Sequence, residues 1–579
     1  MSTQRRTRRL LQLRFFIVGF LLPTLLRPAA ALAEPPRGVD TVVVCPDAWR
    51  PDLLAWVAHR EGQGRRVTVI PPKPTAEETL GAIRAAFDAP AVSDSAAVAA
   101  LSVTTPKRWV LLIGDAGVEG SRAPPGTTPT WFTDGVINPR WGSEPTIATD
   151  LPYADTDGDG RADAAVGRIA CDSAGELRRY TGRVIRYEST RAGRLDGRLL
   201  RLVASPGRFS PWLDRVIEAT AARILADLTP PDCDLHLTYA DWRSPYCPYP
   251  PSMPDAVAAG LQQPALAWVY LGHGQRGSLD LLRTPLGHAR LLDRDLVHKL
   301  QGGRFPPVAA IVACYAGAFD GGDDCLAEAM LKQPGGPLAV VAGSRVTMPY
   351  GNSALGLELL GGFFAGREET LGGLVAAAKR ASLTTPPGTA DTDDRSAGGL
   401  RRAVEAVAAG FTPGEEGRRL ERVEHAQMYN LLGDPLLRVR RPLAAPVSVR
   451  LLADRPRTVV VTCESPFAGE CRLRLKRRGP PAPPGAATRD EFRLNDAARA
   501  EYDASYAAAN APPAADEKRF GVAAGAFTSE LAMPANGDAG ALAADAGGWL
   551  VVAHIAGEEG LAIGYAEVDA PLSSQREPR

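Results

Sequence analysis

Two short apolar runs, each followed by a reactive side chain, constrain this chain most. Ala265–Leu271 leads into a Gly-His-Gly turn at His273, and Val308–Ala313 leads into Cys314. Each run is bounded by Pro or Gly, which predicts a buried strand of a parallel sheet. Open α/β sheets place their ligands at the carboxyl ends of such strands. The two strands would therefore bring an imidazole and a thiol to one crevice, as a cysteine nucleophile with a histidine acid/base requires.

Each half of this pattern has a simpler interpretation when it is taken alone. A Gly-His-Gly turn is often a solvated surface turn, and a Cys after an apolar strand often packs as a small core residue. The two together, both at strand ends and with glycines on either side of His273, indicate catalysis.

The blocks WVYLGHG and AAIVAC resemble the cysteine peptidases of the caspase–legumain–gingipain group. That group has an apolar block, His-Gly, a spacer, a second apolar block and Ala-Cys. The resemblance implies that Cys314 attacks a peptide carbonyl as thiolate and that His273 protonates the leaving amine. The backbone N–H groups of Gly274 and Cys314 would stabilise the oxyanion. A side chain at position 274 would crowd the scissile carbonyl.

Flanking segments resemble gingipain-like enzymes in particular, from about Val39 to Arg440. They are VLLIGD at 110–115, the Val-Gly-Arg segment at 166–168 and LLGDP at 431–435. This resemblance implies that Tyr350 flanks the pocket for the residue before the cut. It also puts Asp214 near the acid that confers arginine preference in that family. The other interpretation of Asp214 is a helix-start acid favoured by the helix dipole.

Strand and helix patterns alternate over most of the chain, which predicts an α/β fold. We expect a two-part caspase-like catalytic region, with parallel sheets flanked by helices, followed by an all-β immunoglobulin-like domain. The first α/β subdomain would span 34–195 and the caspase-like catalytic subdomain 196–441. The β domain, with linker-like insertions, would span 442–579.

The first 33 residues predict a secretory signal peptide. Arg5–Arg9 is a positive segment, Leu10–Leu26 is mostly apolar, and Ala31-Leu32-Ala33 is a small-residue cleavage site. The alternative is an uncleaved anchor helix. We therefore expect an exported protein, in the periplasm, at the cell surface or outside the cell. No later stretch is long and apolar enough to span a bilayer.

Acidic residues recur at alternate positions after residue 154, in the spacing of a calcium loop. Asp155, Asp157 and Asp159 would supply oxygens at positions 1, 3 and 5, and Asp163 at position 9. Position 12 is Val166 where an EF-hand has Glu, so this is no EF-hand. A structural Ca²⁺ loop and a solvated acidic turn both remain open. No organic cofactor is expected.

Lys+Arg and Asp+Glu balance at 66 each, so nothing argues for a nucleic-acid partner. We expect protein or peptide substrates and a monomer. Since export makes disulfides possible, Cys463 with Cys471, and Cys233 with Cys247, are candidate pairs. Two other functions compete: a non-catalytic surface or secretion-associated protein with the same fold, and a serine hydrolase at Ser353, which misses the G-x-S-x-G spacing by one residue.

Overall fold

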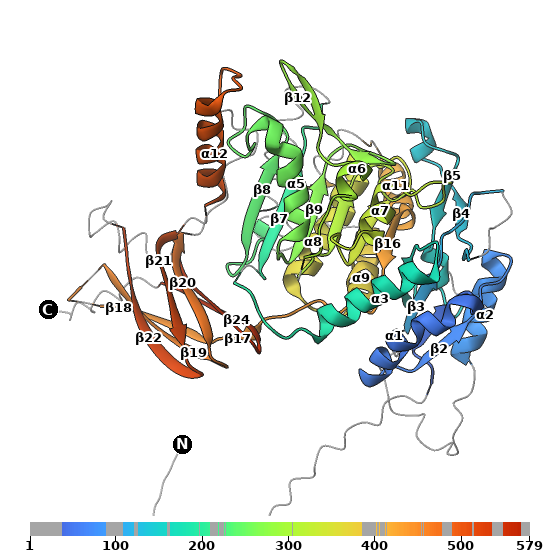
Figure 1. The fold of residues 1–579 in the computed structure, drawn as a ribbon, viewed down its shortest axis with the longest axis horizontal. Helices are drawn as coiled ribbons and strands as arrows, with labels where there is room; N and C mark the ends of the chain where they lie inside the picture. Colours follow the sequence, from blue (N-terminus) through green and yellow to red (C-terminus); the bar gives the residue numbers. More distant parts are fainter. Residues whose placement is uncertain are drawn as a thin grey trace, which may run out of the picture. The chain divides into compact units, whose positions relative to one another are not determined.

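Ten strands from both predicted α/β subdomains form one continuous sheet in the computed structural model (Figure 1). The structure describes residues 38–88, 108–120, 126–158, 162–195, 197–208, 218, 225, 227–303, 305–384, 401, 404–405, 412, 414–452, 454–455, 457–477, 489–511, 514–534 and 548–568. The predicted signal peptide, Asp159 and Asp214 lie outside them. None of the described helices has the length and apolarity needed to cross a bilayer.

The sheet has the order β2-β1-β3-β6-β16-β15-β14-β9-β7-β8. In that order the strands are Val67–Ile70, Thr41–Val44, Arg108–Ile113, Ala164–Ile169, Tyr429–Gly433, Ala339–Gly343, Ala309–Val312, Ala267–Leu271, Leu199–Ala204 and Asp234–Tyr239. Neighbours pair in parallel except β15 and β16, which are antiparallel. We expected two parallel sheets. The structure corrects this, because β16 pairs with β15 on one side and β6 on the other and so joins the two halves.

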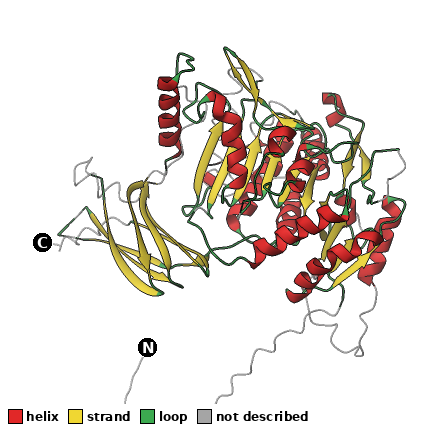
Figure 2. Cartoon of the chain, viewed as in Figure 1, coloured by secondary structure: helices red, strands yellow, loops and turns green. Residues whose placement is uncertain are grey.

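Helices pack against this sheet (Figure 2). They are α1 (Arg50–Gly62), α2 (Ala76–Asp88), α3 (Ala174–Ser189), α5 (Met253–Gln262), α6 (Arg294–Val297), α7 (Leu326–Lys332), α8 (Pro349–Ala365), α9 (Leu371–Leu383) and α11 (Glu415–Met428). Thr75 and Ser173 cap the starts of α2 and α3, since each hydroxyl accepts the N–H of the glutamate three residues later.

Alternate residues of β1 and β3 point to opposite faces of the sheet. Val43 and Leu111 join one hydrophobic core with residues of α1 and α3, whereas Val42 and Val110 join another with residues of α2. Because both faces are covered, these strands are almost continuously apolar, from Val42 to Val44 and from Trp109 to Ile113.

Three short hairpins and several 3₁₀ turns complete the described α/β part of the chain. The hairpins are β4 (Trp131–Asp134) with β5 (Thr146–Thr149), β10 (Gly274–Gln275) with β11 (Ser278–Leu279), and β12 (Leu281–Thr284) with β13 (Gly287–Arg290). Single 3₁₀ turns lie at Asp47–Trp49, Asn138–Trp141, Leu151–Ala154 and Pro250–Ser252.

The C-terminal part contains two sheets that share one hydrophobic core. One has the order β17-β24-β23-β20-β21 and the other β18-β19-β22. In chain order the strands are Leu443–Ala444, Val447–Leu451, Thr458–Ser465, Gly469–Arg477, Ala514–Val522, Gly525–Ala532, Trp549–Gly557 and Gly560–Glu567. A β-rich domain was predicted here, and its immunoglobulin-like character stays a prediction. The helix α12 (Asp496–Asn510) was not predicted.

The eight cysteines are all described and all free thiols, so neither predicted disulfide pair is formed. Cys463 lies on β19 and Cys471 on β20, in different sheets, and both are buried in the shared core. Cys233 and Cys247 are likewise buried. The four thiols pack as small apolar side chains.

Candidate active site

The register of two neighbouring strands places His273 and Cys314 at the same level. Leu271 at the end of β9 pairs with Val312 at the end of β14, and the two strands are parallel. The Gly272 N–H continues the ladder by donating to the Val312 carbonyl at 3.3 Å. His273 and Cys314 each follow two residues beyond the Leu271–Val312 pair. The two predicted residues therefore lie at the carboxyl ends of adjacent strands.

The glycines on either side of His273 are required by close contacts. A Cβ at Gly274 would lie 2.6 Å from the Cys314 carbonyl oxygen and 2.9 Å from the Cβ of Ala313. Gly272 has a φ of +155°, and a Cβ there would lie 2.1 Å from the Ser205 hydroxyl. The backbone after β9 therefore packs directly on the backbone that carries Cys314.

The His273 ring is exposed and is oriented by a backbone carbonyl. Its Nε2 lies 2.8 Å from the carbonyl oxygen of Gly207, in the loop after β7. Since a carbonyl only accepts, Nε2 carries a proton in this contact. The carbonyl of His273 accepts the Tyr270 hydroxyl at 2.8 Å, which fixes the backbone of the turn. Gly207 could not be predicted from the sequence, because the contact joins residues far apart in the chain.

The Cys314 sulfur lies against Thr347. The Thr347 N–H donates to Sγ at 3.3 Å, and the Thr347 hydroxyl is 3.6 Å from Sγ. Asn352 donates its side-chain amide to that hydroxyl at 2.9 Å, and the Tyr429 hydroxyl donates to the Asn352 carbonyl oxygen at 2.6 Å. Sequence reasoning missed Thr347, which lies three residues before the predicted pocket residue Tyr350.

The turn after Cys314 has a strained backbone. Tyr315 is a non-glycine residue with a φ of +56°. Its hydroxyl donates to a carboxylate oxygen of Glu144 at 2.9 Å, and its N–H donates to the Arg345 carbonyl at 3.1 Å. Contacts from two other loops therefore hold the turn.

The other seven cysteines are buried, and burial raises the pKa of each thiol. The pKa rises to about 11 for Cys463 and to about 12 for Cys45, Cys233, Cys247 and Cys471, and it also rises for Cys171 and Cys325. Cys314 is half-buried. Buried thiols of raised pKa are poor nucleophiles, so Cys314 is the accessible thiol of the chain.

A cavity of ≈ 530 Å³ lies beside His273. Its lining includes Gly207, His273, Gly274 and the first strand of the β12–β13 hairpin. The space is large enough for a substrate side chain next to the imidazole.

The other predicted side chains are placed as follows. Tyr350 lies in the first turn of α8, is 2% exposed, and contacts Glu405 and Arg422 through its hydroxyl. Its role as a pocket wall stays a prediction. Ser353 lies inside α8 and donates to the Pro349 carbonyl at 2.8 Å. It is not at the strand-to-helix turn that a serine hydrolase needs.

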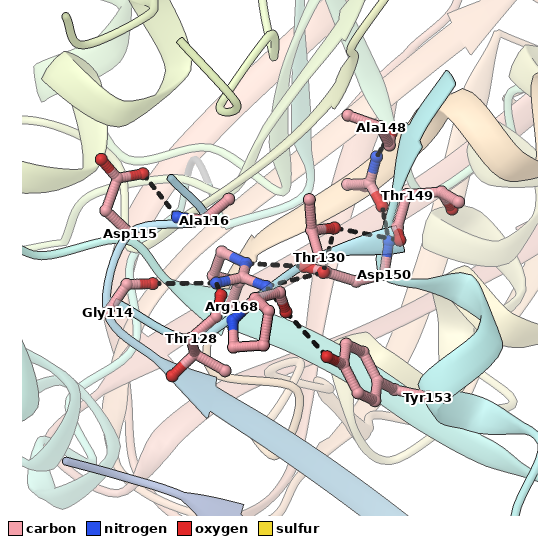
Figure 3. A network of polar contacts seen from close by, with 12 residues as sticks. Gly114, Asp115, Ala116, Thr128, Thr130, Ala148, Thr149, Asp150, Tyr153 and Arg168 are labelled. Carbon is pink, nitrogen blue, oxygen red and sulfur yellow. Dashed lines mark hydrogen bonds and ion pairs between the residues drawn. The ribbon is translucent and has the colours of Figure 1, made fainter. Parts of the chain in front are cut away.

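Arg168, the arginine of the Val-Gly-Arg segment, anchors the loop on either side of the β4–β5 hairpin, at Thr128 and at Asp150 (Figure 3). Arg168 is fully buried and binds both carboxylate oxygens of Asp150, at 2.7 and 2.8 Å. It also donates to the carbonyls of Gly114 and Thr128. The N–H of Asp150 donates to Asn430 on β16 at 3.0 Å. The loop is therefore tied to the central strands of the sheet.

Three carboxylates of the predicted calcium loop converge. Asp155, Asp157 and Asp163 each have an oxygen within 4.8 Å of the other two. Asp155 also accepts Arg84 at 3.0 Å and the Gly158 N–H at 2.8 Å. The donor set suits a hard cation, and Arg84 already compensates part of its charge.

The model of peptidase family C25 matches residues 34–440, which is more than half of the chain. The chain belongs to this family of cysteine peptidases, the gingipain family. The resemblance to gingipain-like cysteine peptidases, inferred from the blocks around His273 and Cys314, is thereby confirmed. No curated protein matches the sequence.

Two solved structures are similar to this peptidase. The arginine-specific cysteine proteinase gingipain R is 15% identical with a TM-score of 0.46, and the match covers 93% of this chain and 99% of that chain. The complex of Porphyromonas gingivalis RgpB pro- and mature domains is 14% identical with a TM-score of 0.47, covering 91% of this chain and 100% of that chain.

Proposed function

We propose that this cysteine peptidase is an exported endopeptidase that works through a dyad of Cys314 and His273. The observation that carries the proposal is the register of β9 and β14, which sets the two residues level at adjacent strand ends. The exposed His273, the half-buried Cys314 and the burial of every other thiol support the same assignment.

The reaction has two steps. The Cys314 thiolate attacks the scissile carbonyl, and the N–H groups of Gly274 and Cys314 stabilise the oxyanion. The intermediate collapses to a thioester, and the amine leaves with a proton from His273. Water then attacks the thioester with His273 as general base, which releases the acid and regenerates the thiol.

The acidic loop between the 3₁₀ turn Leu151–Ala154 and β6 is proposed as a structural calcium site. Asp155, Asp157 and Asp163 fit, because their carboxylates converge. Asp159 completes the sequence pattern. A bound Ca²⁺ would neutralise the clustered carboxylates and stabilise the loop that leads into β6.

The partners follow from the same assignment. Protein or peptide chains are the substrates, and the chain acts as a monomer after export through the signal sequence at residues 1–33. With balanced charge, nucleic acid is not a partner.

The test compares Cys314→Ala and His273→Ala with wild type on casein and on internally quenched peptides. Each variant is expected to lose activity by about 10³-fold or more, because nucleophile and acid act as a unit. His298→Ala is the matched control, since His298 is exposed and outside the site. Casein cleavage by Cys314→Ala at the wild-type rate would instead favour a non-catalytic chain with a contaminating activity.

A further inference from the structure

The cavity beside His273 has an excess of basic side chains. Of the described residues that line it, three are arginines, Arg208, Arg283 and Arg290, and one is acidic, Asp280. A peptide that presents its scissile bond to His273 must place a neighbouring side chain near this cavity. The charge of the cavity therefore bears on which peptides bind.

One arginine is compensated by the single acid. Arg208 donates from Nη1 to both oxygens of Asp280, at 2.8 and 2.7 Å, and from Nη2 to the Leu281 carbonyl. Asp280 also accepts the Leu281 N–H at 2.7 Å. This pair is electrically neutral.

The other two arginines, Arg283 and Arg290, are outside this pair. Arg290 donates to the Ser278 hydroxyl at 2.6 Å, which holds the side chain without neutralising it. Arg283 and Arg290 form no ion pair among the residues that the structure describes. Both are exposed, so a ligand carboxylate can reach them.

The register of the β12–β13 hairpin puts these charges on one face. Leu281 pairs with Arg290, and Arg283 pairs with His288, so Arg283, His288 and Arg290 share that face. Leu282, between them in the chain, points the other way and is 1% exposed. The basic face is therefore a built feature of the hairpin that borders the cavity.

We propose that this cavity selects peptide substrates with an aspartate or glutamate close to the scissile bond. The proposal rests on the catalytic role of His273 and Cys314 and adds the substrate class. A substrate carboxylate would lie against Arg283 and Arg290 and form charge-assisted hydrogen bonds. A lysine or arginine there would meet like charge, which disfavours it.

The test is a cleavage profile of the full-length protein on amidated, acetylated peptides in which one acidic residue is moved through the three positions on each side of the cut. We expect Asp and Glu at one of these positions to raise kcat/KM by up to about fivefold over Asn and Gln, which is the upper end of the range for a partly exposed ion pair. The advantage should shrink as salt rises. Matching peptides with a free C-terminal carboxylate separate side-chain recognition from end recognition, and an advantage found only with them would overturn the proposal.

Variants locate the preference in the hairpin. Arg283→Glu and Arg290→Glu should abolish the preference for acids and favour Lys at the same position, and the milder Arg283→Gln should weaken it. Arg450→Glu makes the same charge change on an exposed strand residue outside the cavity and should leave the profile unchanged. A wild-type profile without acid preference, or a preference that survives both charge reversals in folded protein, overturns the proposal. If the wild-type protein cleaved none of the peptides, the result would instead contradict the proposed catalytic role of His273 and Cys314.

Discussion

The contact between Gly274 and the Cys314 backbone makes Gly274→Ala a sharp test of the site geometry. The added Cβ would lie 2.6 Å from the Cys314 carbonyl oxygen, whereas ordinary contact begins at 3.4 Å. One backbone segment must therefore move by 3.4 − 2.6 = 0.8 Å. The added Cβ would also lie 2.9 Å from the Cβ of Ala313, so it cannot avoid the Cys314 carbonyl by shifting towards Ala313. Neither neighbour is the end of a flexible side chain, so the shift separates the two strand ends that carry the reactive groups.

The expected effect is larger on activity than on stability. Overpacking at one backbone contact costs about 1–3 kcal/mol of unfolding free energy. A misplacement of about 1 Å between reacting groups costs about 10²-fold in rate. Peptide cleavage at subsaturating substrate gives kcat/KM, and thermal unfolding of the same preparation gives stability.

Gly81→Ala is the matched control. Gly81 is exposed in the middle of α2, and a Cβ there would meet nothing within 4 Å. This change should stabilise the protein by about 0.5–1 kcal/mol and leave kcat/KM unchanged. If Gly274→Ala kept kcat/KM within about twofold of wild type, the inferred contact between the two strand ends would be wrong.

Three further predictions concern reactivity, pH and calcium. Iodoacetamide should label the native protein at Cys314 alone, because the other thiols are buried, and peptide mapping would reveal any second site. Burial lowers the pKa of His425 to about 4, so only the unfolded chain takes up this proton as pH falls below about 6.5. Stability is therefore lost as pH drops towards 4, and the stability difference between wild type and His425→Gln should shrink by about 1 kcal/mol from pH 7.5 to 5.5 in urea melts. A chelator should lower the melting temperature of wild type but not of Asp157→Asn, and an unchanged wild-type melt would exclude the calcium loop.

The strands, and the places of His273 and Cys314 at their carboxyl ends, were predictable because their signals are local. An apolar run with Gly or Pro at its ends defines each strand, and the position of His273 or Cys314 after the run defines its place at the carboxyl end. The joining strand β16 was missed for a physical reason. It begins at Tyr429, directly after α11 ends at Met428, with no Gly or Pro between them. Its two partners, β15 and β6, are also distant in sequence.

The helix α12 was missed because its alanine-rich sequence has a weak apolar face. The signal that was available is Asn495, whose side chain accepts the Ala498 N–H and starts the helix. Tyr506 then reaches the Thr238 hydroxyl on β8 at 2.7 Å. Tertiary contact of this kind stabilises a helix that composition alone describes as a linker.

Backbone strain in the described part of the chain lies next to the contacts of His273 and Cys314. Only two of its non-glycine residues have positive φ, Arg208 at +54° and Tyr315 at +56°. Arg208 follows the carbonyl that contacts His273, and Tyr315 follows Cys314 itself. Such a conformation costs about 1–2 kcal/mol per residue and persists where side-chain contacts enforce it.

Each strained residue has such a contact. Asp280 holds Arg208 through two hydrogen bonds, and Glu144 accepts the Tyr315 hydroxyl. Each acid thus fixes the backbone next to His273 or Cys314 through a neighbouring residue. The proposed dyad is therefore positioned by residues outside it, and these act through the conformation of the main chain.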